Sequence, residues 1–140
     1  MTSPSMASLL AAPLVSATGT PFSSAVLRGH PLILQFWNTR CAVCQANDWL
    51  LRSWGFEYAD RGLFVVGVLE QDTRANLNRY ERDFALGMVS TVDVRQQLVR
   101  TYGVHTVPTI LFIDPSGHVM KTVHGALAQQ DILDGLKLIL

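Results

Sequence analysis

Two short, almost wholly apolar runs restrict the fold most strongly, because each is followed by a stretch with helical periodicity. The first run is LILQFW (residues 32–37) and the second is LFVVGVL (residues 63–69). A strand without polar alternation is typical of a position that is buried on both faces. Strands that alternate with helices pair in parallel through right-handed crossovers. The sequence therefore predicts an α/β domain whose central sheet carries helices on both faces.

Local patterns predict the remaining elements. Short apolar segments flank Thr18-Gly19-Thr20, so residues 13–23 are expected to form a hairpin. Helices are expected over residues 41–59, 72–86, 93–103 and 127–140. A second pair of strands is expected over residues 109–114 and 118–125. Gly55 is placed to end or bend the first helix, and Asp72 is placed to cap the second. Residues 88–92 are expected as a short connecting segment, which leaves a small mixed sheet.

The length and composition indicate one folded domain. The chain has 140 residues, of which 49% are hydrophobic and 16% are charged, and such a chain can bury a core of its own. The first twelve residues are rich in Ser and Ala. We expect residues 1–12 to be a flexible arm and residues 13–140 to be the domain.

The charge balance argues against several classes of partner. Eleven basic residues balance eleven acidic ones, and no run of like charge reaches four residues. A nucleic-acid-binding protein usually carries a stripe of basic residues, so no nucleic-acid partner is expected for this chain. The apolar runs are too short to span a membrane. The first basic residue is Arg28, so the N-terminus lacks the basic leader of a secretory signal. If the natural protein is exported or anchored, we expect the responsible segment to be missing from this sequence.

The only two cysteines, Cys41 and Cys44, lie where the first apolar run meets its helix. At that junction, the sulfur of Cys41 would face free backbone N–H groups and the positive end of the helix dipole. In such a pair the pKa of the first thiol can fall from roughly 8.5 to between about 3.5 and 7.5. Cys41 is therefore expected to attack a partner disulfide, and Cys44, shielded one turn further along, to resolve the mixed disulfide.

Other uses of the cysteine pair fit less well. A disulfide between residues three apart closes a very small loop, so it constrains the unfolded chain little. A zinc site needs four ligands, and no histidine stands at finger-like spacing. Covalent haem attachment needs a histidine after the second cysteine, where this chain has Gln45. The redox pair is the favoured interpretation, with no metal and no cofactor expected.

Two motifs then resemble those of a known family. LRGHPLILQFWNTRCAVC (residues 27–44) and YGVHTVPTILFIDPSGHV (residues 102–119) are similar to the two signatures of the thioredoxin superfamily. The closer likeness is to the TlpA/ResA/DsbE-type bacterial thiol–disulfide oxidoreductases, an AhpC/TSA-Redoxin-like group, and it spans about residues 13–140. The resemblance implies a thioredoxin-like three-layer α/β/α sandwich with a mixed central sheet, to which the N-terminal β-hairpin is added.

The resemblance also implies a substrate-binding loop. It places a cis peptide bond before Pro108, with the backbone of Val107 turned outward to pair with an extended client peptide. Without the resemblance, Pro108 would read equally as a trans proline at a strand entry. Trp37 matches the family tryptophan beside the active site and is expected to help bind substrate, although plain core packing explains it too. Arg40 is also expected at the substrate site. It stands where the family usually has an aromatic residue, and it either favours the Cys41 thiolate or is simply solvated.

The chain departs from the family at the positions that manage protons. Gln35 replaces a buried aspartate, and Asn47 replaces an acid three residues after the second cysteine, so neither position titrates. Glu70, at the end of the second apolar run, is a possible acid–base group. A solvated glutamate at a strand end is the favoured interpretation. His105 is a second possible acid–base group, for which a solvated loop histidine is favoured.

The function implied by the resemblance is that of a protein-disulfide oxidoreductase, expected to act as a reductase in the bacterial cell envelope. Cytochrome c maturation and stress protection are the implied settings. Protein thiols and disulfides are the expected partners, with a membrane reductant of DsbD type, and the protein is expected to be a monomer. The expected location is periplasmic or membrane-anchored, with a cytoplasmic location left open.

Two other functions are alternatives to this one. One is a metal-handling module that uses Cys41, Cys44 and a histidine. The other is a thioredoxin-fold peroxidase, although such enzymes usually carry a threonine where this chain has Asn38.

Overall fold

The computed structural model describes residues 14–83 and 89–140, so the expected arm at residues 1–12 lies outside the described part. Its centre is one six-stranded sheet with the strand order β1-β4-β3-β2-β5-β6. The strands are β1 (Leu14–Ser16), β2 (Leu32–Trp37), β3 (Phe64–Leu69), β4 (Val89–Asp93), β5 (Thr109–Ile113) and β6 (Val119–His124). The helices are α2 (Ala42–Glu57), α3 (Arg74–Asp83), α4 (Gln97–Thr101) and α5 (Gln129–Ile139), with short 3₁₀ turns η1 (Ser24–Leu27) and η2 (Ala59–Arg61).

The sheet is mixed, as the sequence predicts. β2 and β3 are parallel, and so are β3 and β4. β5 runs antiparallel to β2 and to β6, and β1 runs antiparallel to β4. Parallel pairing is therefore confined to the three central strands, which are joined by the crossover helices.

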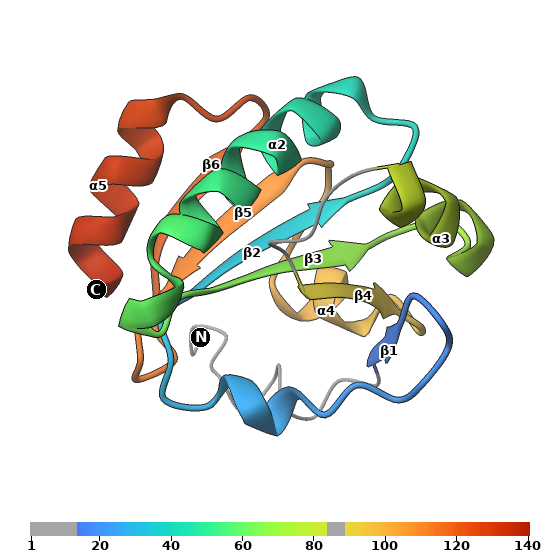
Figure 1. The fold of residues 1–140 in the computed structure, drawn as a ribbon, viewed down its shortest axis with the longest axis horizontal. Coiled ribbons are helices and arrows are strands. Elements are labelled where there is room, and N and C mark those ends of the chain that lie inside the picture. Colours follow the sequence, from blue (N-terminus) through green and yellow to red (C-terminus); the bar gives the residue numbers. More distant parts are fainter. Residues whose placement is uncertain (1–13, 84–88) are drawn as a thin grey trace.

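Helices cover both faces of the sheet and give three layers (Figure 1). Successive residues of a strand point to opposite faces. Ile33 packs in a core cluster with Leu51 of α2 and with the apolar face of α5. Its neighbour Leu34 packs in a second cluster with Leu98 of α4 and with η1. The predicted α/β/α sandwich is confirmed. Within the described ranges, no helix is both long enough and apolar enough to pass through a membrane.

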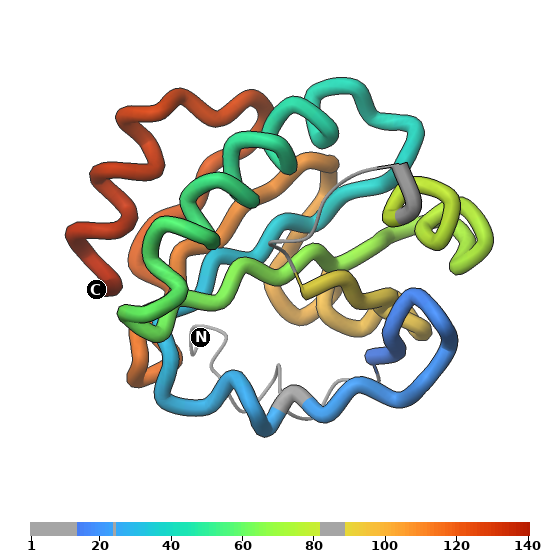
Figure 2. The backbone as a smooth tube through the Cα atoms, in the orientation of Figure 1, coloured from blue at the N-terminus to red at the C-terminus, as the bar shows by residue number. Residues whose placement is uncertain are grey.

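One end of the sheet gathers the segments that carry the candidate site. Figure 2 shows that the chain leaving β2 and the chain leaving β3 turn at the same end. Because β5 runs antiparallel to β2, it begins at that end. The cysteines after β2, Glu70 after β3 and Pro108 before β5 therefore come from neighbouring strands at one end of the sheet.

Strand β4 is the main element that the sequence did not predict. A connecting segment is expected at residues 88–92, but Val89–Asp93 form a strand parallel to β3. Thr91 is fully buried, and its hydroxyl donates to the carbonyl oxygen of Gly67 at 2.9 Å. This strand is short and polar, so pairing with β3, rather than local propensity, makes it a strand.

The N-terminal hairpin is only partly formed. The turn is present, because the backbone N–H of Gly19 donates to the carbonyl oxygen of Ser16 at 3.0 Å. The returning arm makes a single bridge, between Pro21 and Val15, since proline has no N–H with which to extend a ladder. β1 pairs with β4 instead and so forms one edge of the sheet.

The helices are shorter than expected. α4 begins at Gln97, because Asp93 ends β4 and accepts hydrogen bonds from the backbone that follows. α3 begins at Arg74, and the remainder of its expected range, 84–86, lies outside the described residues. Gly55 neither ends nor interrupts α2, which continues to Glu57 with the glycine buried inside it.

Gly135 marks the closest approach of α5 to the sheet. A Cβ atom at this position would overlap the ring of Phe112. Helix propensity alone favours alanine over glycine by about 1 kcal/mol. Since Phe112 is fully buried in the core, its ring cannot turn toward solvent to relieve the overlap, and we expect Gly135→Ala to lower the free energy of unfolding by about 1–3 kcal/mol. Urea unfolding would measure this, with the exposed Lys137→Ala as the control on the same helix. A variant more stable than the wild type would contradict the prediction.

Candidate functional site

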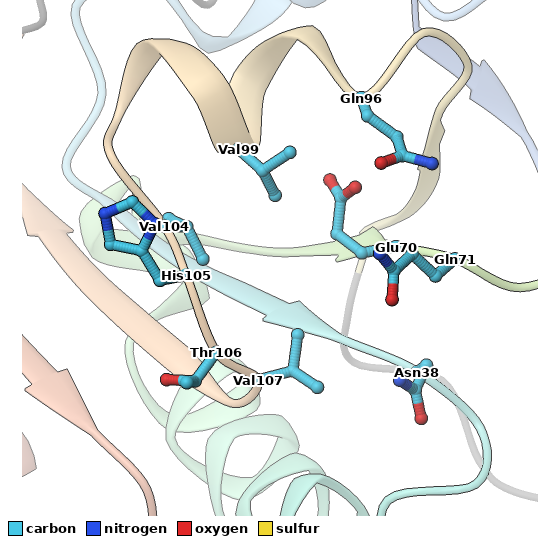
Figure 3. A pocket seen from close by; sticks show the side chains of 9 residues that line it. All are labelled: Asn38, Glu70, Gln71, Gln96, Val99, Val104, His105, Thr106 and Val107. Atoms are coloured by element: carbon cyan, nitrogen blue, oxygen red, sulfur yellow. The ribbon is translucent and has the colours of Figure 1, made fainter.

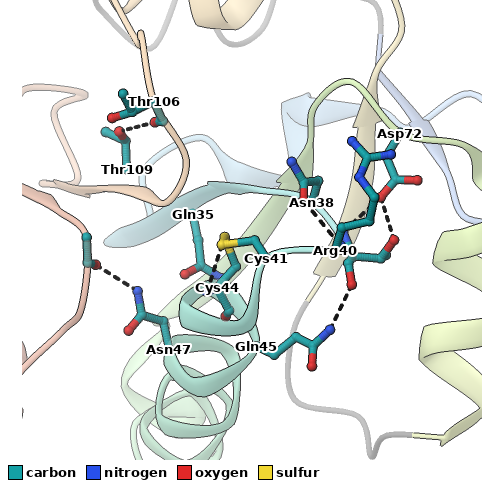
Figure 4. The surroundings of a disulfide bond; sticks show 12 residues. Gln35, Asn38, Arg40, Cys41, Cys44, Gln45, Asn47, Asp72, Thr106 and Thr109 are labelled. Atoms are coloured by element: carbon teal, nitrogen blue, oxygen red, sulfur yellow. Dashed lines mark hydrogen bonds between the residues drawn. A yellow bond between two sulfur atoms is a disulfide. The ribbon is translucent and has the colours of Figure 1, made fainter.

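Cys41 and Cys44 are joined by a disulfide at the start of α2, with 5.1 Å between their Cα atoms (Figure 4). Cys41 is the N-cap residue, and its sulfur accepts the backbone N–H of Cys44 at 3.1 Å. Cys41 is partly exposed, whereas Cys44 is fully buried. The predicted position at a strand–helix junction is confirmed, and Cys41 carries the sulfur that a partner can reach.

The loop before the cysteines is fixed by Asp72. The backbone N–H and the hydroxyl of Thr39 both donate to Oδ2 of Asp72, at 2.8 and 2.5 Å. Burial raises the pKa of Asp72, but hydrogen bonds from Thr39, Asn76 and the backbone of Thr73 outweigh it and hold the pKa at about 2. The side chain of Gln45 adds a bond to the carbonyl oxygen of Thr39 at 2.7 Å. The loop that leads into Cys41 is therefore fixed by the Asp72 carboxylate, which is charged at neutral pH.

Gln35 and Trp37 lie beneath the cysteines. Gln35 is fully buried, and its amide nitrogen donates to the carbonyl oxygen of Cys44 at 3.4 Å. Trp37 is also fully buried and packs in one cluster with Cys44, its ring 4.9 Å from that of Tyr80. The expectation that Trp37 binds substrate needs correction, because a ring with no exposed surface supports the cysteines from below and offers no contact to a client.

The loop before β5 carries the second predicted motif. The Val107–Pro108 peptide bond is cis. Val107 is half-buried and packs, as Cys41 does, against the cluster around Trp37. The hydroxyl of Thr109 donates to the carbonyl oxygen of Thr106 at 2.7 Å, which fixes the turn. The two motifs, some 60 residues apart in the sequence, therefore share one packing cluster.

Arg40 is exposed next to Cys41, but its guanidinium is directed elsewhere. Nη2 of Arg40 donates to the carbonyl oxygen of Gln71 at 3.0 Å. Its backbone N–H donates to the side chain of Asn38 at 3.2 Å. The head group therefore joins the loop after β2 to the loop after β3, which agrees with the alternative that this arginine is solvated.

Glu70 is not the solvated strand-end glutamate that the sequence favours. Its side chain is only 4% exposed, and among the residues that the structure describes no N–H or O–H donor reaches either carboxyl oxygen. Burial raises the pKa of Glu70 to about 10, and the neighbouring carboxyl of Asp93 acts in the same direction. Glu70 is therefore a neutral acid at pH 7. The sequence missed this burial because it depends on α4 and on Asp93.

Asp93 adds to the effect of burial on Glu70. The carboxylate of Asp93 accepts the backbone N–H groups of Gln97, Leu98 and Val99, at 2.9, 3.0 and 3.3 Å. Its two oxygens are thus committed to the start of α4 as acceptors. A charge on Glu70 would be buried beside Asp93, which adds to the effect of burial and raises the pKa of Glu70 further.

Glu70 lines a small pocket at the same end of the sheet. Figure 3 shows its carboxyl pointing toward α4, between Val99 and Gln96, with Val107 on the opposite side. His105 is exposed and contributes to the lining of the pocket, which agrees with the favoured interpretation of a loop histidine. Neither cysteine lines the pocket. Glu70 and Val107 are brought together, whereas Glu70 and the cysteines do not share this pocket.

Asn47 has a structural role that the sequence did not reveal. It is 3% exposed, its amide nitrogen donates to the carbonyl oxygen of Gly125 at 3.0 Å, and its oxygen accepts the N–H of Leu127 at 2.9 Å. It therefore ties α2 to the loop between β6 and α5. Its position three residues after Cys44 is the one feature of the sequence that marks Asn47.

A buried ionic network behind the cysteines was also missed. Asp48 and Arg52 are 1% and 2% exposed, and Nε of Arg52 donates to Asp48 at 2.9 Å. The hydroxyl of Tyr80 donates to Asp48 at 2.5 Å, and Nη2 of Arg52 donates to Glu81 at 2.7 Å. Burial raises the pKa of Asp48 despite these bonds. The four-residue spacing of Asp48 and Arg52 was the one sequence signal, and it did not show that the pair is buried.

A metal site finds no support in the described residues. Within residues 14–83 and 89–140, no group of three or more His, Cys, Asp or Glu side chains is placed to hold a metal ion. The metal-handling alternative needs a histidine next to the cysteines, so nothing in the described part of the chain favours it.

Comparisons of the sequence agree with this geometry. The profile of the AhpC/TSA family matches residues 7–122. Thiol-disulfide oxidoreductase ResA of Geobacillus thermodenitrificans is 28% identical over 112 residues, which are 80% of this chain and 64% of that protein. ResA of Bacillus subtilis is 24% identical over 126 residues, which are 90% of this chain and 70% of that protein. The chain thus spans about two thirds of the length of these relatives.

Solved structures share the fold. The pneumococcal exposed lipoprotein thioredoxin Etrx1 of Streptococcus pneumoniae has a TM-score of 0.77 and 26% identity, with 91% of this chain and 98% of that chain covered. A secreted Mycobacterium tuberculosis disulfide oxidoreductase homologous to DsbE of E. coli has a TM-score of 0.81 and 20% identity, with 95% and 98% covered. The fold is therefore thioredoxin-like, and a CxxC pair stands at its helix start.

Proposed function

The chain belongs to the AhpC/TSA family, and on that premise we propose that it is a thiol–disulfide oxidoreductase of ResA/DsbE type that acts on protein thiols and disulfides. One observation carries the proposal: Cys41 is partly exposed and its sulfur caps α2, with the buried Cys44 one turn behind it. Backbone N–H groups at a helix start stabilise a thiolate, which is the nucleophile in disulfide exchange.

The reduced protein would reduce a client in two exchanges. The Cys41 thiolate attacks one sulfur of the client disulfide, so the Cys41–client bond forms and the client S–S bond breaks. Cys44 then attacks the sulfur of Cys41, the Cys41–Cys44 disulfide forms, and the mixed disulfide breaks. Two electrons pass to the client, whose second sulfur leaves as a thiolate. The proton of Cys44 goes to a departing client sulfur, directly or through water, since Gln35 and Asn47 carry no titrating group.

The loop of Val107 and Pro108 is the proposed peptide-binding element. Backbone pairing between Val107 and an extended client would hold the scissile disulfide near Cys41. Arg40 would border the entry, where its guanidinium already lies against the loop after β3. His105 would lie at the edge of the same surface.

The proposed setting is the bacterial cell envelope. The relatives named above are thiol-disulfide oxidoreductases, and Etrx1 is named an exposed lipoprotein. We propose that the protein works outside the cytoplasm as a monomeric reductase, in cytochrome c maturation or in stress protection. A membrane reductant of DsbD type would supply its electrons.

Two measurements test the activity. We expect the wild type to catalyse reduction of insulin by dithiothreitol, Cys41→Ser to fall to the uncatalysed rate, and Cys44→Ser to accumulate a mixed disulfide that mass spectrometry detects. Equilibration with a thiol redox couple should give a potential below about −250 mV, in the range of thioredoxin-type reductants. An active Cys41→Ser variant would contradict the assigned nucleophile. A potential above about −150 mV would contradict the reducing direction.

A further inference from the structure

We propose that the pocket between Val107, α4 and Glu70 is a subsite for one cationic side chain of the bound client, a lysine or an arginine, whose head group reaches the Glu70 carboxyl (Figure 3). This inference rests on the proposed function, because it assigns a neighbouring subsite to the peptide held at Val107. It would make the protein selective among clients.

The position of the pocket suits a side chain of such a peptide. Val107 forms one wall, so a strand paired with its backbone would run along the pocket mouth. The cavity holds about 110 Å³. Since about 10–15 Å³ is enough for one water molecule, the pocket has room for several heavy atoms. A client side chain next to the reacting cysteine can therefore enter it.

Glu70 supplies the unsatisfied group that calls for a ligand. Both of its carboxyl oxygens are buried, and within the described part of the chain neither receives an N–H or O–H donor. Buried polar groups in proteins are nearly always hydrogen-bonded, and exceptions call for an explanation. The Glu70 oxygens lack N–H or O–H donors, and an ammonium or guanidinium group provides several N–H donors.

The charge of the carboxyl pair favours a cation over a neutral donor. Asp93 accepts three backbone N–H groups of α4, and the Glu70 carboxyl lies beside it as a neutral acid. The guanidinium of Arg40 is directed to the carbonyl oxygen of Gln71. A cationic head group would take the place of the Glu70 proton, which passes to solvent, and would compensate the Glu70 carboxylate.

The walls of the pocket fit the rest of such a side chain. Val99, Val104 and Val107 are apolar, and they suit the methylene stem of lysine or arginine. The side-chain amides of Asn38 and Gln96 lie at the polar side of the pocket, where their oxygens can accept further hydrogen bonds from N–H groups. Apolar walls above a buried carboxyl group suit a lysine or arginine side chain, with its methylene groups along the walls and its charged head group at the carboxyl.

The test uses the full chain as its Cys44→Ser variant. This variant would react once with cysteine peptides activated as mixed disulfides with thionitrobenzoate, whose release gives the rate constant. The peptides carry lysine, arginine, glutamine or norleucine at each position flanking the cysteine. At one position we expect the lysine and arginine peptides to react about tenfold or more faster than the glutamine and norleucine peptides, because a charged hydrogen-bonded pair forms in a buried site.

Two further variants assign the preference to Glu70. Added Glu70→Gln should bring the lysine-to-glutamine ratio close to one. Added Glu57→Gln makes the same side-chain substitution at an exposed site of α2 and should leave the ratio unchanged. Equal rates for all peptides in the parent variant would overturn the subsite while the proposed function stands. A preference for norleucine or glutamine peptides would also overturn the subsite, and so would a lysine preference that persists in the Glu70→Gln variant. Failure of every peptide to react would overturn the proposed function, and the subsite with it.

Discussion

Replacing Arg52 with methionine is expected to lower the free energy of unfolding by about 3–5 kcal/mol, because it leaves a charge buried without its partner. Arg52 is 2% exposed, and its guanidinium contacts Asp48 at 2.9 Å and Glu81 at 2.7 Å. Methionine fills a similar volume, so the loss reports the broken ionic contacts more than a cavity. Asp48, at 1% exposed, cannot turn to water without opening the packing between α2 and α3.

Urea unfolding at pH 7 would measure the effect, with Arg79→Met on the exposed face of α3 as the control. The double variant Asp48→Asn, Arg52→Met removes both charges and keeps an acceptor for the hydroxyl of Tyr80. It should therefore be more stable than the Arg52→Met single variant. A single variant within 1 kcal/mol of the wild type, or a double variant below the single one, would contradict this account.

The network also explains how α2 presents the cysteines. Asp48 lies one turn after Cys44, and Tyr80 of α3 joins it to the ring of Trp37. Asn47 holds the opposite side of the same turn to the loop after β6. The start of α2 is thus fixed from both sides, which keeps the sulfur of Cys41 at the surface while the sheet and α3 enclose Cys44.

The cysteine site was predictable because its parts are local in the sequence. An apolar strand, two cysteines three apart and an amphipathic helix specify a helix start on their own, and the structure has α2 within two residues of the expected range. β4 was not predictable in this way. Its residues carry no apolar alternation, and the strand exists because β3 on one side and β1 on the other provide ladders.

The faces of the central strands could not be predicted either. LILQFW has no polar alternation, so the sequence does not say that Trp37 points beneath α2 and Leu34 toward α4. The burial of Glu70 is a second case. Glu70 directly follows β3, a position where glutamates are usually solvated, and only the α4 segment some 25 residues later encloses it. Contacts between distant segments decided both features.

Replacing Glu70 with glutamine is expected to raise the free energy of unfolding at pH 7 by about 3 kcal/mol. Burial raises the pKa of Glu70 from 4.5 to about 10, so the folded state holds a proton that the unfolded state releases at pH 7. Each pH unit above 4.5 therefore favours unfolding by about 1.4 kcal/mol, for as long as the folded state keeps the proton. Glutamine has a similar size and carries no such proton, so it does not have this cost.

The sign of this effect gives a pH signature that a packing change would not. The contribution of Glu70 is fully present below pH 4.5 and is lost as the pH rises toward about 10. The difference in stability between Glu70→Gln and the wild type should therefore be small at pH 4.5 and should widen steadily to pH 8, as measured by urea unfolding at each pH. Glu57→Gln, at an exposed site, should show no such widening. A constant difference across this range would mean that Glu70 is ionised in the folded protein, and a subsite that binds a cation by displacing its proton would then have no basis.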